Sequence, residues 1–250
     1  MTKKTDFDTL HQHGTFVMPN PWDRGSALVL QELGFPALAT TSSGLGRSIG
    51  KDDQEVTRDE LIAHVAEITS VLDVPLNVDS ERLYPDEPGG IATTVRMLAD
   101  AGASGCSIED YDPSTQSIDE VDRAANAVAV AAQACAEHSL LLTARAENHL
   151  YGANDLDNTV ERLLAYQGAG CDVLYAPGLK SIADISRVVS QVERPINVLA
   201  MPDAPSVPEL AKLGVRRVSI GGSLYNAAYR SLRIAAEEVR DHGTSDYARR

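Results

Sequence analysis

Four acidic residues in this sequence could form a metal site. Asp79 and Glu81 follow one short apolar run, and Glu109 follows the next apolar run along the chain. Asp53 lies in the long segment before them and could join them. Carboxylates that share a pocket raise one another's pKa and cannot all stay ionised without a cation. An all-oxygen set suits magnesium or manganese rather than zinc. The alternative interpretation is that each acid caps the helix after its strand.

Arg145 is the second feature with obvious chemical use, because it ends an apolar run at residues 140–144. At the mouth of a site, its planar guanidinium could hold a substrate carboxylate through two parallel hydrogen bonds. Its alternative role is an internal salt bridge to Glu147 or Glu109.

The elements that must position these residues follow a repeated pattern: a helical stretch, a glycine turn and a short β-branched run. Eight strands that alternate with helices in about 250 residues are typical of a (β/α)8 barrel, and an open doubly wound sheet is the alternative. We predict one domain over residues 1–250, with the active site at the carboxyl ends of the strands, where the acids and Arg145 stand. The predicted strands are residues 15–18, 37–40, 76–78, 105–108, 140–144, 173–175, 196–199 and 217–220.

Three helix starts can be predicted from capping boxes, in which Ser or Thr precedes Glu by three residues: Thr57, Ser117 and Ser206. Residues 44–50 (GLGRSIG) superficially resemble a dinucleotide-binding loop. They do not open directly into a predicted helix, so we interpret them as a loop that covers the substrate.

The two ends of the sequence are predicted to be peripheral. Residues 1–14 are expected to form an accessory lead-in, with His11 and His13 solvated. Residues 241–250 are expected to form a polar tail.

The composition excludes several classes of partner. Acidic residues number 36 against 22 basic ones, which gives a net charge of −14 and argues against nucleic acid or an anionic membrane. No apolar run approaches the ~18 residues of a membrane span, and no signal peptide is visible. Three scattered cysteines are interpreted as small buried residues, so a cytoplasmic protein is predicted.

Several motifs together carry a family resemblance: NPWDRGSA at 20–27, TSSGLG at 41–46, GKDD at 50–53, NVDSE at 77–81, SIED at 107–110, TARAE at 143–147, YAPG at 175–178 and NVLA at 197–200. With these motifs the chain resembles the isocitrate lyase/phosphoenolpyruvate mutase superfamily, in its short bacterial branch, over residues 16–238. The resemblance implies a (β/α)8 barrel whose C-terminal helix is exchanged between the subunits of a homotetramer or homodimer.

The resemblance also implies a magnesium ion bound directly by Asp79. Asp79 is expected to be the direct ligand, because it is the first polar residue after its strand and is expected to have no other partner. Asp53, Glu81 and Glu109 are implied to reach the ion mainly through water.

The substrate contacts implied by the resemblance lie on neighbouring loops. Ser43, Gly44 and Leu45 are implied to hold the 2-oxo acid end of the substrate, with Arg145 on a carboxylate. Trp22, which follows the first predicted strand, is assigned to the same binding site. Asp53 and Arg145 are also predicted to be catalytic.

Two segments depart from the family pattern. The loop at residues 111–117 (YDPSTQS) has no Lys, Cys or His, although lyases and mutases of the family carry such residues there. Tyr111 is therefore a candidate substitute acid, with Tyr84 as another. Arg82 stands where small residues are usual, and is expected to contact a second anion or to be a solvated surface charge.

These departures lead to the predicted reaction. Decarboxylation of a 3-carboxy-2-oxo acid needs mainly a Lewis acid that stabilises the enolate, whereas retro-aldol cleavage needs both a base and an acid. We predict a magnesium-dependent lyase for a small 2-oxo or 2-hydroxy di- or tricarboxylate, with oxaloacetate decarboxylation as the first hypothesis. The alternatives are retro-aldol cleavage of the 2-methylisocitrate kind, and a protein that binds a 2-oxo acid such as 2-oxoglutarate, or serves as a scaffold, with little catalysis.

Overall fold

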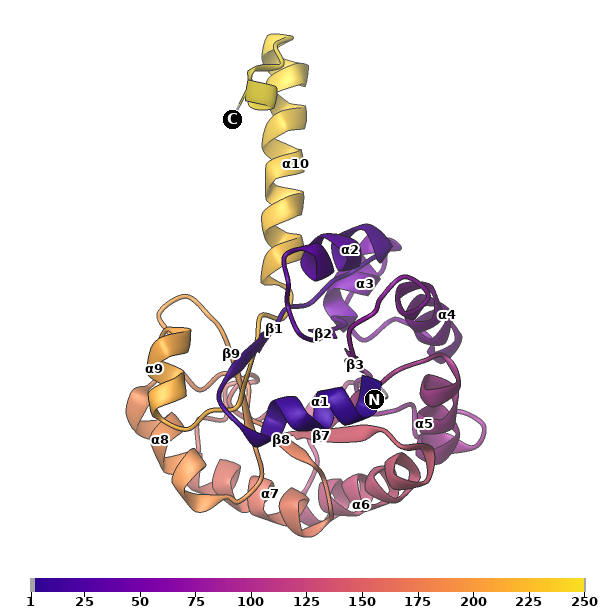
Figure 1. Cartoon of the computed structure of the whole chain (residues 1–250), viewed down its shortest axis with the longest axis vertical. Coiled ribbons are helices and arrows are strands. Elements are labelled where there is room, and N and C mark those ends of the chain that lie inside the picture. The colour runs from indigo at the N-terminus through magenta and orange to yellow at the C-terminus, as the bar shows by residue number, and fades with distance from the viewer. Residues whose placement is uncertain (1–2, 250) are drawn as a thin grey trace.

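The computed structural model describes residues 3–249, and it places eight parallel strands around a central axis with helices outside them (Figure 1). All eight predicted strands are present, each to within one residue at either end. The strands of the barrel are β1 (Phe16–Met18), β2 (Leu38–Ala39), β3 (Leu76–Val78), β4 (Gly105–Glu109), β7 (Leu141–Arg145), β8 (Val173–Tyr175), β9 (Ile196–Leu199) and β10 (Arg217–Ser219).

The helices lie between the strands, and small aliphatic side chains fill the space between the two layers. They are α1 (Lys3–Gln12), α2 (Arg24–Glu32), α3 (Ser42–Ser48), α4 (Arg58–Thr69), α5 (Gly90–Asp100), α6 (Val121–His138), α7 (Leu156–Gly168), α8 (Ile182–Gln191), α9 (Val207–Lys212), α10 (Ser223–His242) and the 3-10 helix η1 (Asp246–Arg249). Among residues 3–249, no helix has the length and apolar character that crossing a membrane requires.

The sheet runs in the order β1-β10-β9-β8-β7-β4-β3-β2, and polar contacts join its two ends. The Ala39 N–H donates to the Pro19 carbonyl at 3.0 Å. The side chain of Asn20 donates to the Thr40 carbonyl at 2.8 Å and accepts from the backbone N–H of Gly221 at 2.8 Å. Asn20 therefore links β1, β2 and β10 at one end of the barrel, and the predicted (β/α)8 barrel is confirmed.

Two of the three predicted helix starts are confirmed, and one is wrong. Thr57 and Ser206 form capping boxes that open α4 and α9. Ser117 instead lies in β6 (Ser117–Ile118), which pairs antiparallel with β5 (Tyr111–Asp112). Helix α6 begins only at Val121, because pairing with β5 keeps the backbone of Ser117 extended.

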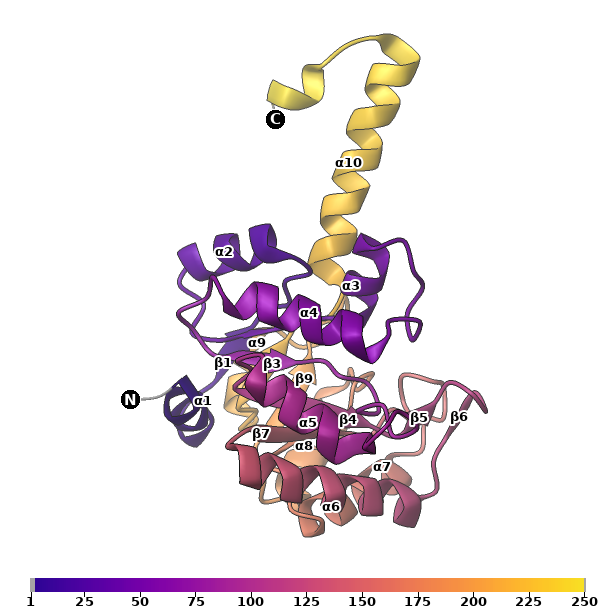
Figure 2. The same ribbon diagram turned by 90° about the vertical axis from the view of Figure 1, so that its right-hand side faces the viewer.

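The N-terminal segment is an integral part of the barrel, so its prediction as a solvated lead-in was wrong. Helix α1 lies across the end of the barrel opposite the β5–β6 hairpin (Figure 2). Phe7 is fully buried there and His11 is 5% exposed, whereas His13 is exposed as predicted. Phe7 and His11 face the strand ends, where burial of their rings stabilises the closed floor of the barrel.

Helix α10 projects away from the barrel (Figures 1 and 2). Only its first turn is anchored, through the buried Tyr225, while Leu232 is 63% and Ile234 is 51% exposed. The helix continues to His242, so the polar tail begins later than the predicted Asp241. The predicted exchange of this helix between subunits stays a prediction.

Candidate active site

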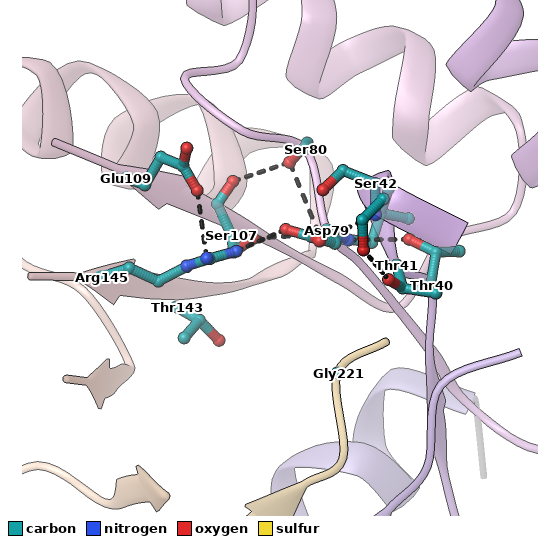
Figure 3. A network of polar contacts seen from close by, with 12 residues as sticks. Thr40, Thr41, Ser42, Asp79, Ser80, Ser107, Glu109, Thr143, Arg145 and Gly221 are labelled. Atoms are coloured by element: carbon teal, nitrogen blue, oxygen red, sulfur yellow. Dashed lines mark hydrogen bonds and ion pairs between the residues drawn. The ribbon is translucent and has the colours of Figure 1, made fainter. Parts of the chain in front are cut away.

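The carboxyl ends of β3, β4 and β7 bring three of the predicted residues together (Figure 3). Glu109 and Arg145 are the last residues of β4 and β7 and lie opposite each other in the strand register. Asp79 directly follows β3. A cavity of about 170 Å³ opens at this end of the barrel, and Asp53, Asp79 and Arg145 all line it.

The guanidinium of Arg145 binds three carboxylates at once. Its Nη1 lies 2.5 Å from Asp79 Oδ1, its Nη2 lies 3.2 Å from Glu109 Oε2, and its Nε lies 2.7 Å from Glu147 Oε1. Burial alone would lower the pKa of Arg145, but Glu147, Glu109 and Asp79 raise it. The internal salt bridge offered as the alternative role of Arg145 is thus present, and it includes Asp79 as a third partner.

Asp79 has partners on both carboxylate oxygens, so the expectation that it has none was wrong. Oδ1 pairs with Arg145, and Oδ2 accepts from the backbone N–H of Ser42 at 2.9 Å. The reason is the packing of neighbouring strand ends: β2 and β3 pair in parallel, and α3 starts just after β2. That arrangement presents the first turn of α3 to the residue after β3.

The other two acids of the predicted set are close enough to Asp79 for its charge to act on them, and Asp53 lines the cavity, whereas Glu81 lines a separate pocket. Burial, followed by the charge of Asp79, raises the pKa of Asp53. Burial and the charges of Asp79 and Asp53 raise the pKa of Glu81 to about 8. Burial also raises the pKa of Glu109, with Arg145 acting in the opposite direction. These pKa shifts show that the four carboxylates interact and that one guanidinium does not neutralise them all.

The fit of this site to a cation can be tested on Glu81. Its Oε1 is buried and has no hydrogen-bond partner among the described residues, which is costly for a carboxylate oxygen. As the side chains stand, residues 3–249 contain no group of three His, Cys, Asp or Glu residues arranged around one metal position. Arg145 lies between Asp79 and Glu109 and holds both. The acids therefore have the chemistry that a hard divalent cation needs, and Arg145 would have to release Asp79.

Comparison with known proteins places this geometry in a family. The phosphoenolpyruvate phosphomutase family matches residues 7–240. The chain belongs to this family. The predicted membership of the isocitrate lyase/phosphoenolpyruvate mutase superfamily is therefore confirmed, and with it the prediction of an enzyme of the lyase and mutase class.

Individual relatives agree with this membership. A solved structure from Burkholderia cenocepacia J2315, provisionally described as a lyase/mutase, is 41% identical with a TM-score of 0.94 and covers 99% of this chain and 91% of that chain. An oxaloacetate decarboxylase of Paraburkholderia xenovorans is 29% identical, with 92% of this chain and 80% of the relative covered. A 2-methylisocitrate lyase of Escherichia coli is 26% identical, with 87% of this chain and 77% of the relative covered.

In this phosphomutase-family barrel, residues 42–48 form helix α3, so the predicted loop at residues 44–50 was wrong. The Thr41 side chain caps α3 and accepts from Gly44 N–H at 3.3 Å, while Leu45 N–H donates to the Thr41 carbonyl at 2.9 Å. A Cβ on Gly44 would lie 2.5 Å from Thr41 and 3.0 Å from Trp22 Cβ, so the close packing requires glycine. Of the predicted substrate contacts, Ser43 lines the cavity, whereas Trp22, Gly44 and Leu45 pack behind it.

The segment that departs from the family pattern is the β5–β6 hairpin. Tyr111 stacks on Tyr151 with ring centroids 3.6 Å apart, and its side chain does not line the cavity. Arg82 pairs with Asp112 at 2.9 Å and Asp119 at 2.8 Å. Arg82 is therefore neither a solvated charge nor a free anion contact, because it ties the loop after β3 to the base of the hairpin.

Sequence reasoning missed two residues of the site. Gln54 has a positive φ of 67°, and its side chain donates to Glu109 Oε1 at 3.0 Å. Its backbone N–H also acts to lower the pKa of Asp53 and Glu81, against the effect of burial. Arg217 lines the floor of the cavity. An arginine inside the strand predicted at residues 217–220 was the available signal for Arg217, whereas Gln54 gave none.

Proposed function

We propose that this protein is a magnesium-dependent carbon–carbon lyase that acts on a small 2-oxo or 2-hydroxy di- or tricarboxylate, with oxaloacetate as the first substrate to test. The observation that carries the proposal is a cavity lined by Asp53, Asp79 and Arg145, with Glu109 paired to Arg145 and Glu81 close enough to Asp79 for their charges to interact. The relatives that are an oxaloacetate decarboxylase and a 2-methylisocitrate lyase support the same class of reaction.

The acids are the proposed holders of the cation. Asp79 would bind magnesium directly, and Asp53, Glu81 and Glu109 would reach it through water; manganese suits the same oxygen ligands. When bound, the metal supplies a Lewis acid that stabilises negative charge on the 2-oxo oxygen of the substrate. The unpartnered Oε1 of Glu81 supports a cation at this position.

The protein's own groups bind and orient the substrate. Arg145 exchanges a protein carboxylate for a substrate carboxylate, and the Ser43 hydroxyl donates to the 2-oxo acid end beside Gly44 and Leu45. With oxaloacetate, the C3–C4 bond breaks, carbon dioxide leaves, and the electron pair of that bond remains with the C2–C3 fragment. A proton from water then reaches C3 and gives pyruvate. No protein acid is needed for this last step, which agrees with a hairpin that offers no Lys, Cys or His.

Retro-aldol cleavage of the 2-methylisocitrate kind is the second candidate, and one observation favours it. Tyr111 stacks on Tyr151 at the mouth of the barrel, and Tyr151 is close enough to the acids that burial and the charges of Glu109 and Glu147 raise its pKa. A tyrosine hydroxyl is therefore near the site. Tyr84 is less suited to the role of acid, because its hydroxyl already donates to the Val56 carbonyl at 3.0 Å.

The test is a screen of product release with magnesium, with manganese and with EDTA. We expect the protein to release pyruvate from oxaloacetate at a rate well above that of the decarboxylation that the free metal ion causes. The Asp79→Ala protein with the same metal serves as the control for that background rate. Release of succinate from 2-methylisocitrate would favour the second candidate. Binding of 2-oxo acids without turnover of either compound would overturn the enzymatic proposal and leave a 2-oxo acid binding protein.

A further inference from the structure

Arg217 occupies an unusual position for a charged residue. It is the first residue of β10, its side chain is 2% exposed, and it lines the floor of the cavity whose mouth holds Arg145. A packed apolar core is usual at this depth of a (β/α)8 barrel. Here the walls near Arg217 are polar but uncharged: Ser107, Thr143, Asn197 and Ser219.

The guanidinium of Arg217 has only neutral partners. Nε donates to Asn197 Oδ1 at 3.0 Å, Nη2 donates to Thr143 Oγ1 at 2.9 Å, and Nη1 lies 3.4 Å from Nε2 of His11. His11 is neutral, because burial and Arg217 lower its pKa to about 3, and its Nδ1 bonds the Phe7 carbonyl. A guanidinium has five N–H groups, so two of them have no protein partner within the described part of the chain.

The absence of a carboxylate partner sets Arg217 apart. Within residues 3–249, no Asp or Glu forms an ion pair with it. The other arginines that are largely buried each pair with at least one carboxylate: Arg58, Arg82, Arg145 and Arg162. Burial lowers the pKa of Arg217 to about 9, so it remains a cation at neutral pH. A buried charge without an opposite charge is costly, and an anionic ligand would remove that cost.

A second side chain in the same cavity has a polar atom without a hydrogen-bond partner. Asn77 is 4% exposed and lines the cavity, and its Oδ1 has no hydrogen-bond partner among the described residues. A floor that served only to close the barrel would satisfy its buried polar groups internally. The two unpartnered groups belong to one cavity, which points to a polar ligand.

We propose that Arg217 binds a carboxylate of the substrate at the floor of the cavity, while the opposite end of the substrate lies at Arg145 and the acids. This inference rests on the proposed function, and it narrows the substrate to an acid with two separated carboxylates. Its chemistry is a charge-assisted pair between the guanidinium and a carboxylate, with the hydroxyls of Thr143 and Ser107 as neighbouring donors.

The spacing of the two arginines indicates the length of that acid. Thr143, which Arg217 contacts, precedes Arg145 by two residues on β7. Two residues of strand span about 6.6 Å, or roughly 5 Å along the axis once the tilt of barrel strands is included. This separation suits a diacid of about five carbons, and the cavity of about 170 Å³ is the space that would hold it.

The charge of Arg217 also restricts which carboxylate it holds. A carboxylate paired with a guanidinium is stabilised as the anion, so it is not the group that leaves as carbon dioxide. The substrate therefore carries a carboxylate beyond the reacting carbons. On this inference, five-carbon and larger acids rank above oxaloacetate in the screen.

The test compares two ligands that differ only at the far end, 2-oxoglutarate and 2-oxopentanoate, by calorimetric titration in magnesium buffer. We expect the wild type to bind 2-oxoglutarate at least tenfold more tightly. Arg217→Gln should weaken 2-oxoglutarate ten- to a hundredfold and change 2-oxopentanoate less than twofold. Arg217→Lys keeps the charge, so its affinity for 2-oxoglutarate should lie between that of the wild type and that of Arg217→Gln. Arg216→Gln is the matched control, because Arg216 is adjacent and bonds only the Gly14 carbonyl at 3.3 Å.

The outcomes separate this inference from the proposed function. Equal binding of the two ligands by the wild type would overturn the inference without any variant, and so would an equal loss of both ligands in a folded Arg217→Gln protein. If Arg217→Gln does not fold, the wild-type preference and Arg217→Lys decide. Selective binding of 2-oxoglutarate without cleavage of any acid would support the inference and contradict the proposed function.

Discussion

Replacing Arg145 by lysine separates the charge of this residue from its fork-shaped geometry. Arg145 makes three charge-assisted contacts, to Asp79, Glu109 and Glu147, and a lysine ammonium at the same position can reach one or two of these carboxylates. Each hydrogen bond to a charged group contributes about 1.5–3 kcal/mol net. The 14% exposure of the Arg145 side chain lets water replace part of that loss. We expect a loss of about 1.4–4 kcal/mol of transition-state binding, which corresponds to roughly a ten- to thousandfold lower kcat/KM.

Replacing Arg145 by methionine should act on stability as well. The side chains of Glu147 and Glu109 are 1% and 3% exposed, so this change leaves two buried carboxylates without their cation. Breaking a buried ion pair on one side costs about 3–5 kcal/mol. The thermal unfolding temperature of Arg145→Lys should therefore be well above that of Arg145→Met, although both variants lose activity.

The assay is initial-rate kinetics on the acid selected by the product screen, together with thermal unfolding of each variant. Arg96→Lys is the control, since Arg96 forms an exposed pair with Asp100 and the change should leave both measurements unaltered. Normal kinetics in Arg145→Lys would refute the reasoning and assign Arg145 to structure alone.

Four further predictions follow from the site and the fold. Asp79→Ala should abolish magnesium binding and turnover while the circular dichroism spectrum is retained, and unchanged turnover would remove the proposed metal chemistry. Tyr111→Phe should leave decarboxylation almost unchanged but slow a retro-aldol cleavage by ~10²–10⁴, as measured by pyruvate and succinate release. Burial and Arg217 lower the pKa of His11 to about 3 in the folded state. The unfolded chain therefore binds more protons than the folded protein below about pH 6.5, and the stability of the fold should decrease as the pH is lowered. Between pH 6.5 and 5 the free energy of unfolding should fall by about 1.7 kcal/mol, and denaturant unfolding of His11→Gln should show a shallower pH slope than the wild type. Leu232→Arg, on the exposed face of α10, should shift the sedimentation profile toward monomer, and a wild type that sediments as a monomer would contradict the predicted helix exchange.

The sequence predicts the barrel well, because each strand is a local signal. An apolar run ended by a glycine turn or a polar residue defines a buried strand with few alternatives, and Asp79, Glu109 and Arg145 are placed correctly because they end such runs. The same local logic failed at Ser117. Its capping-box pattern is genuine, but pairing with β5 took precedence over the helical preference of the motif.

Contacts between distant segments explain the remaining errors. The prediction that His11 is solvated rests on the polar residues around it in the sequence, yet Phe7 and Phe16 pack against its ring and Arg217 lies against it from 206 residues away. The two carboxylates that pair with Arg82 are also distant in the sequence, and Asp119 lies 37 residues further along. The pairing of Asp79 with Arg145 needs the relative position of β3 and β7, which no local pattern gives. Gln54 was missed because its role depends on a positive φ that glutamine rarely adopts.

The closure of this barrel also has a consequence for how the chain folds during synthesis. Within residues 3–249, β1 has β10 as its one partner in the sheet, and Thr15 donates to the carbonyl of Val215, 200 residues later. Contacts of such large sequence separation form slowly, because the entropy of closing the intervening chain must be lost first. A nascent chain that still lacks residues 217–219 has no partner for β1 and no Arg217 for His11. The N-terminal helix, although made first, is therefore among the last elements to dock, and the unclosed sheet is the state most exposed to misassociation on the ribosome.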